Sequence, residues 1–219
     1  MTMALEDRFG PFAHVFERGE LEVPGHLELL GLNSSGVQVV IDRIVVAIAA
    51  GDTPRWLTAL LHDVNWRPHL VGAIALIVEP TLDSSLLWYA IDRGSWAIPQ
   101  LVVVAAHVDP RFRERIRERA DAQCPVAVPS GLGPIERHSA TGPEGQTDRS
   151  AKMLASILAM SAEFPDLAGW RAKTLEDDRT KAMLAVDASW NKSDQIVLSW
   201  LDALRSAFRA RGRSLHLVE

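Results

Sequence analysis

The chain has 219 residues, 47% of them hydrophobic and 23% charged, so it can bury a sizeable core and disorder is not its default. The net charge is −5, and the single cysteine, Cys124, excludes a scaffold held by disulfides within the chain. With no apolar leader at the N-terminus and no apolar stretch near the roughly 20 residues of a membrane span, these features predict a cytoplasmic protein.

Charge is divided unevenly along the chain. Residues 1–110 contain six arginines, no lysine and thirteen acids, a balance of −7, whereas residues 111–219 have a balance of +2. An acidic half disfavours nucleic-acid binding, because phosphate contacts need basic side chains. It would suit a basic protein partner. A surface that is acidic only for the sake of solubility explains the asymmetry equally well.

The first predicted element is a short capping segment over residues 1–25, where three phenylalanines stand among glycines and prolines. Such a cap is expected where a stack of repeats would otherwise expose its apolar face. A helix follows over about residues 36–50, with apolar side chains on most of its faces. This pattern predicts a helix buried between its neighbours.

The strongest pattern is a repeat with a period of thirty residues. Residues 56–80 and 86–110 align without a gap, and a weaker copy lies at 26–50. Each copy is predicted to fold as helix, tight turn and helix, and self-similarity of this length is typical of stacked helical repeats. The two clear copies share identical residues at Leu57/Leu87, Trp66/Trp96, Ala75/Ala105, Val78/Val108 and Pro80/Pro110.

Polar residues mark the turns within the copies. Asn65 and Ser95 are predicted to accept hydrogen bonds from the first N–H groups of the helix that follows. Four aspartates stand at equivalent or nearly equivalent turn positions, and helix capping is the favoured role for them, with a catalytic acid as the alternative. These aspartates are Asp63, Asp92, Asp109 and Asp187. His62 and His69 flank one turn and are interpreted as ordinary, partly exposed histidines.

The second half begins with a charged helix, RFRERIRERAD, predicted over residues 111–121. Arg111, Arg115 and Arg119 share one face and are able to touch phosphate, but the interleaved glutamates favour a solvated face of ion pairs. These residues end an N-terminal repeat region, 1–123. Residues 124–148 hold four glycines and four prolines and are predicted to be a linker or a functional loop. Residues 149–219 are predicted to continue the stack, with helices near 150–163, 166–176, 179–188 and 193–211.

The turns and second helices HDVNWRPHLVGAIALI and IDRGSWAIPQLVVVAA, each closed by an acid and a proline, resemble HEAT-like α-repeats in general architecture. The resemblance covers residues 26–110 well and 150–211 poorly, and the period is shorter than the forty or so residues typical of that family. It implies an all-α fold, an α-solenoid of antiparallel helix pairs. Most such repeats are protein-binding surfaces, and a minority, the HEAT-like DNA glycosylases, act on alkylated bases.

The sequence contains no recognisable catalytic or metal-binding motif. It has no zinc-ligand spacing, no calcium loop, no phosphate loop and no nucleophile motif, so no catalytic residue, metal or cofactor is predicted and enzymatic activity is not favoured. Seven tryptophans are present. Trp66 and Trp96 recur with the repeat and are predicted to pack in the core or the turns. Trp170 and Trp190 do not clearly follow it and are candidate interface anchors.

The sequence therefore predicts a protein-binding α-repeat module. One version is an immunity protein or antitoxin that neutralises a basic enzyme by covering its active site. The alternatives are a glycosylase-type enzyme, for which the acidic half lacks a basic groove, and a structural adaptor that forms homo-oligomers. The candidate binding residues are Trp170, Trp190, Asp63, Asp92, Arg111 and Arg115.

Overall fold

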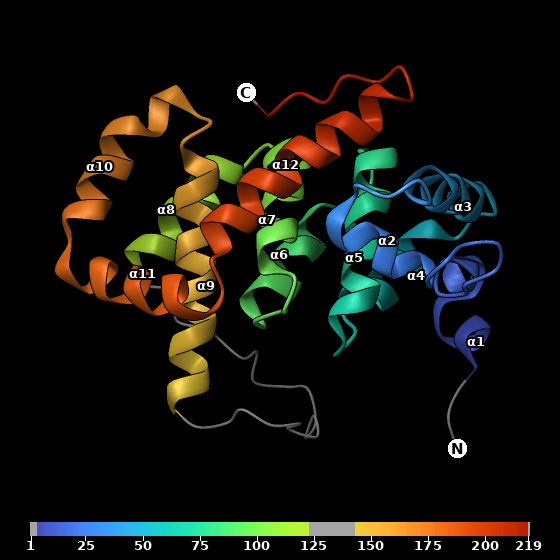
Figure 1. Cartoon of the computed structure of the whole chain (residues 1–219), viewed down its shortest axis with the longest axis horizontal. Helices are drawn as coiled ribbons and strands as arrows, with labels where there is room; N and C mark the ends of the chain where they lie inside the picture. Colours follow the sequence, from blue (N-terminus) through green and yellow to red (C-terminus); the bar gives the residue numbers. More distant parts are fainter. Residues whose placement is uncertain (1–3, 123–142, 219) are drawn as a thin grey trace.

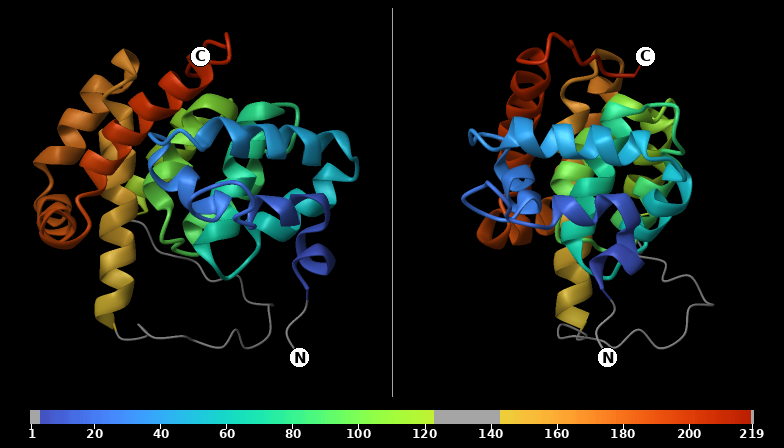
Figure 2. Two further views of the ribbon diagram at one scale, coloured as in Figure 1. Left: turned by 45° about the vertical axis from the view of Figure 1, so that its right-hand side comes forward. Right: turned by 90° about the vertical axis from the view of Figure 1, so that its right-hand side faces the viewer.

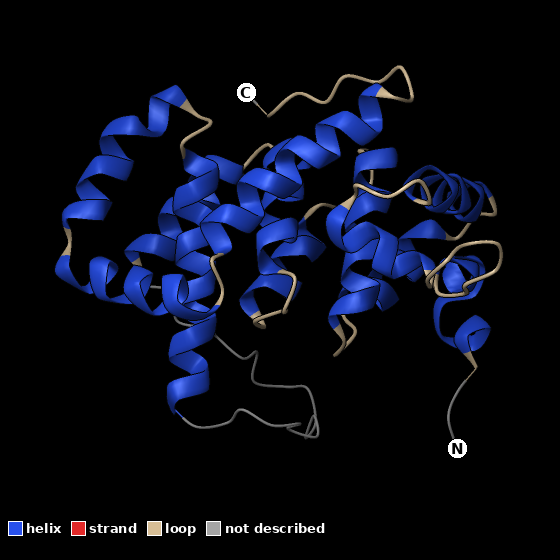
Figure 3. Cartoon of the chain, viewed as in Figure 1, coloured by secondary structure: helices blue, strands red, loops and turns tan. Residues whose placement is uncertain are grey.

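The computed structural model describes residues 4–122 and 143–218, with all their side chains except those of 143–148 and Trp190. Over these residues the fold is all-α with 72% helix and no strand, as predicted (Figure 3). The predicted Gly/Pro-rich segment lies outside the described residues from 124 to 142, and residues 143–148 begin a helix.

The N-terminal part holds short elements followed by paired helices (Figure 1). Its elements are α1 (Leu5–Phe9), the 3₁₀ helix η1 (Gly10–Val15), α2 (Gly25–Gly31), α3 (Val37–Ala49), α4 (Thr53–Leu61), α5 (Trp66–Val78), α6 (Ser85–Asp92), α7 (Ile98–Val108) and α8 (Phe112–Asp121). The C-terminal part contains α9 (Pro143–Ser161), the 3₁₀ helix η2 (Pro165–Leu167), α10 (Ala168–Glu176), α11 (Asp178–Trp190) and α12 (Ser193–Arg209).

The two clear sequence copies fold as equivalent helix pairs, α4–α5 and α6–α7. Their matched residues Leu57 and Leu87 are both buried. The predicted cap is confirmed at the first turn, where the Asn65 side chain accepts from the backbone N–H of Arg67 in α5 at 3.1 Å. At the second turn Ser95 Oγ accepts at 3.1 Å from the N–H of Ala97, the residue before α7, so it does not cap that helix as predicted. Because α3 packs on α5, α5 on α7 and α4 on α6, the second helices form a central layer.

The last helix, α12, contacts α2 and α3 from the start of the chain. Helix α12 packs against α7 and α9, and the Trp200 indole N–H donates to the carbonyl of Leu29 in α2 at 3.1 Å. Gln38 of α3 donates to the carbonyl of Ala207 at 3.0 Å. Figure 1 and Figure 2 show α12 crossing the molecule from α9 toward α3.

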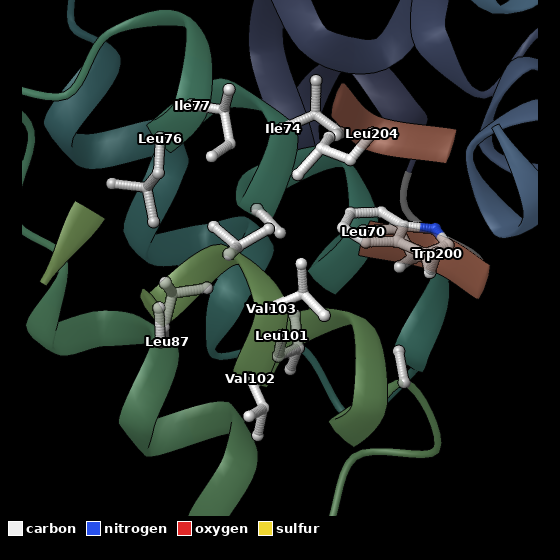
Figure 4. Close-up of a cluster of buried hydrophobic side chains, with 14 of the residues drawn as sticks. Leu70, Ile74, Leu76, Ile77, Leu87, Leu101, Val102, Val103, Trp200 and Leu204 are labelled. Carbon is white, nitrogen blue, oxygen red and sulfur yellow. The ribbon is translucent and has the colours of Figure 1, made fainter. Parts of the chain in front are cut away.

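The centre of the core lies where α5, α7 and α12 meet (Figure 4). Here α5 is buried along almost its whole length, and so is α7, because neighbours cover them on several sides. Trp200 and Leu204 of α12 lie close to Leu70 and Ile74 of α5. The chain's own C-terminal helix therefore covers the central layer, on a face where an open stack of repeats would offer a groove.

Candidate protein-binding surface

The six predicted binding residues lie on different parts of the molecule. Asp63 is in the α4–α5 turn, Asp92 ends α6, Arg111 precedes α8 and Arg115 lies within it, whereas Trp170 is in α10. Trp190 ends α11, and its side chain is outside the described part of the structure. The structure thus brings Asp92 and the arginine helix α8 together but does not gather all six into one site.

Three of these residues are engaged in partly buried ion pairs within the fold. Asp63 is buried, pairs with Arg8 and accepts from the backbone N–H of Asn65 at 2.7 Å. Asp92 accepts from Arg119 Nε at 2.7 Å, and the Arg119 guanidinium lies 4.2 Å from the Trp88 ring centroid. Arg115 pairs with the third repeat aspartate through a 3.0 Å contact between Nε and Asp109 Oδ2. Their charges are neutralised locally, so they offer little to a partner.

The remaining two differ in exposure. Arg111 is exposed and pairs with Glu114 at 2.7 Å between Nε and Oε2. Solvent screens such a pair, so it contributes little to stability. The carboxyl pKa of Glu114 is lowered by this hydrogen bond from the guanidinium. Trp170 is half-buried against the core, and its indole N–H has no hydrogen-bond partner among the described atoms.

Capping fits one of the repeat aspartates, Asp187, as predicted, whereas Asp109 bonds to the residue that precedes its helix. Asp109 accepts from the backbone N–H of Arg111 at 2.9 Å where α8 begins. Asp187 accepts from the backbone N–H of Ser193 at 2.9 Å and from its hydroxyl at 2.7 Å where α12 begins. Because both carboxylates are buried and hydrogen-bonded, they hold the helix starts in place.

The buried imidazole of His69 joins the two repeat turns. The sequence-based prediction that His69 is partly exposed is therefore wrong. His69 Nε2 donates to the carbonyl of Asp63 at 2.9 Å, and Nδ1 accepts from the Ser95 hydroxyl at 2.7 Å. Burial lowers the pKa of His69 and keeps it neutral. Ser95 is buried and also accepts from Ala97, so this hydroxyl–imidazole pair fixes the turns and does not present a nucleophile.

A shallow hollow on the outer face of α3 joins apolar and acidic side chains. We call it the α3 hollow, and its lining is Pro11, His14, Glu20, Val39, Asp42, Arg43 and Val46. Val46 is 69% exposed, and Val45 beside it is exposed as well. The prediction of an α3 buried on most faces is therefore wrong on this side. The sequence signal for it was the consecutive apolar residues Val45 and Val46, which one buried stripe of a helix does not accommodate.

Carboxylates dominate the accessible charge of the α3 hollow. Arg43 Nη1 donates to the carbonyls of His14 and Glu17, each at 3.1 Å, so its guanidinium is turned toward the backbone. Both carboxylates have an arginine partner, Arg43 at 4.0 Å from Glu20 and Arg211 at 2.7 Å from Asp42, but their own side chains stay 73% and 64% exposed. An apolar floor with an acidic rim fits a segment that is apolar at its centre and basic at its margins.

Other kinds of site find no support among the described residues. No group of three or more His, Cys, Asp or Glu side chains in this part of the chain is arranged to hold a metal ion. No helix found in it is long and apolar enough to cross a membrane.

Comparison of the sequence with protein-family models and with curated proteins, and of the structure with solved structures, found no match. The assignment of function therefore has to come from the surface itself.

Proposed function

We propose that this chain is a protein-binding α-helical repeat domain of the HEAT-like, α-solenoid type, and that it binds a basic partner through the α3 hollow. The observation that carries the proposal is the combination of exposed Val46 with the exposed carboxylates of Glu20 and Asp42. A contiguous apolar patch rimmed by charge is typical of interaction surfaces. The single cysteine supports placing the protein in the cytoplasm.

An immunity-type protein that neutralises a basic enzyme is the specific form we favour. The balance of −7 over residues 1–110 extends the acidic character beyond the hollow and would speed encounter with a cationic surface. The repeat aspartates that a glycosylase-type enzyme would use are held in ion pairs or helix caps. The binding module therefore accounts for more of the described surface than that alternative does.

The test is capture of partners by the full chain at low salt from the cell that produces it, with identification by mass spectrometry. Three proteins are compared: wild type, Val46→Asp, and the control Leu198→Asp, which changes a 47% exposed leucine on α12. We expect wild type and control to retain one basic protein in stoichiometric amount, and Val46→Asp to lose it. Equal retention by all three, recovery of nucleic acid, or self-association alone would contradict the proposal.

A further inference from the structure

A second exposed surface lies where the turns of the two helix pairs meet, separate from the α3 hollow. Trp66 and Trp96 come from equivalent positions of the two copies, and their ring centroids are 4.9 Å apart. Trp96 is 54% exposed, and Val64 in the preceding turn is 67% exposed. Both turns project on the same side of the molecule, at the lower edge in Figure 1.

Arginines surround this aromatic pair. The Arg67 guanidinium lies 5.0 Å from the Trp66 ring centroid. Arg93 Nη1 donates a hydrogen bond to the carbonyl of His62 at 2.9 Å. Arg149 of α9 covers the second turn: a Cβ added at Gly94, where φ is +79°, would lie 2.5 Å from Arg149 Cδ. We call Val64, Trp66, Arg67, Arg93, Trp96 and Arg149 the turn edge. No ion pair joins any of its arginines to a carboxylate of the described residues.

Hydrogen bonds and a cation–π contact fix the conformation of the turn edge. The hydrogen bonds of His69 to the Asp63 carbonyl and to Ser95 Oγ join the two turns that carry the tryptophans. Lys152 Nζ lies 5.4 Å from the Trp96 ring centroid and 3.4 Å from the Trp96 carbonyl oxygen. An aromatic surface that is fixed before binding loses little conformational entropy when it binds.

We propose that the turn edge binds an acidic segment of a protein that carries an aromatic or aliphatic anchor. Tryptophan and arginine are among the residues most enriched at interface hot spots, and here both types occur at two adjoining turns. The cationic rim selects carboxylates, and the exposed indole of Trp96 takes the apolar anchor. A nucleic acid fits less well, because its phosphates need an extended track of cations and the rest of residues 1–110 is acidic. The proposal does not depend on the function of the α3 hollow, whose charge is opposite.

The probe is a fluorescently labelled glutamate–tyrosine copolymer, and binding to the full chain is followed by fluorescence anisotropy. Salt is set at about 0.1 M, where the Debye length of about 10 Å screens the distant acids. We expect Trp96→Ala to weaken binding at least about tenfold and Arg67→Gln to weaken it and flatten its salt dependence. Truncation at an exposed position elsewhere, Leu198→Ala, should leave the affinity unchanged.

Three results would overturn the proposal. The first is no measurable binding of the acidic copolymer. The second is binding that Trp96→Ala and Arg67→Gln both leave intact. The third is tighter binding of a single-stranded thymidine oligonucleotide or of a lysine–tyrosine copolymer. Since Trp96 is more than half exposed, its truncation is expected to leave the fold unchanged, and far-ultraviolet circular dichroism checks this.

Discussion

The Ser95 hydroxyl donates to Nδ1 of His69 at 2.7 Å, and this contact joins the turn of one helix pair to the second helix of the other. Both side chains are buried. All hydrogen-bonding atoms of the imidazole are satisfied, because Nε2 donates to the Asp63 carbonyl. Two turns that are equivalent in sequence are thereby held at a fixed spacing.

Removing the hydroxyl should destabilise the protein. Ser95→Ala leaves the buried Nδ1 of His69 and the N–H of Ala97 without a partner. We expect the free energy of unfolding to fall by about 1–3 kcal/mol, measured by urea denaturation. Ser199→Ala is the control, because Ser199 is exposed on α12, and it should change stability by less than about 0.5 kcal/mol. Equal effects of the two substitutions would contradict the structural role of Ser95.

Acid should destabilise the fold before its carboxylates are protonated. Burial lowers the pKa of His69 and His107, and burial together with the charge of Arg67 lowers that of His26 from 6.5 to about 4. Below 6.5 the unfolded chain binds protons at these histidines that the folded chain does not bind, so lower pH favours unfolding.

The free energy of unfolding is therefore expected to decrease as pH falls from about 6.5 toward 5, measured by denaturation at several pH values. Hydrogen bonds lower the carboxyl pKa of Glu79 and Asp177, so their contribution is lost only at lower pH. His26→Phe should reduce the slope, with His216→Gln at an exposed position as the matched control. Stability that is constant or rises over this interval would contradict the prediction.

Asp109 should be one of the most sensitive carboxylates. It accepts from the Trp88 indole and the N–H of Arg111, and it pairs with Arg115. Asp109→Asn removes the negative charge from a buried site and leaves Arg115 unpaired, so we expect a loss of about 2–4 kcal/mol in unfolding free energy. The control is Asp166→Asn, where an exposed pair with Arg113 should contribute less than about 1 kcal/mol. A loss at Asp109 no larger than that at Asp166 would show that the buried pair is not important.

Two leucines of α12 allow a matched test of its docking. Leu204 is fully buried against α5, whereas Leu198 is exposed. Leu204→Ala should reduce the unfolding free energy by about 2–5 kcal/mol, because a cavity remains in the core. Leu198→Ala should reduce it by less than about 1 kcal/mol. Calorimetry on both variants measures the difference, and similar losses would be inconsistent with the packing described.

Local signals in the sequence located most helices well. The predicted helices at 36–50 and 193–211 correspond to Val37–Ala49 and Ser193–Arg209, because prolines, capping residues and apolar periodicity mark helix ends locally. The return of α12 to α2 and α3 was not predictable. Periodicity tells which face of a helix is apolar, but the partner of that face depends on the complete packing.

The candidate surfaces were harder to predict for the same reason. Asp92 was expected to cap a helix, yet it pairs with Arg119, which comes from a helix that no local pattern places beside it. Trp96 was predicted to pack at the core or a turn, and it does contact Trp66 at the turn, but half of its surface stays exposed. Exposure of this kind depends on where the neighbouring helices end.

The last helix, α12, is hydrogen-bonded to α2 and α3 near the start of the chain. The helices at the two ends of the fold therefore cannot unfold independently of each other. An open array of repeats contacts only nearest neighbours, so it can fray from its ends. Here, detaching the final helix would also expose Trp200 and the inner faces of α5 and α7. Denaturation should therefore proceed as one sharp transition, with tryptophan fluorescence and helical circular dichroism changing at the same midpoint.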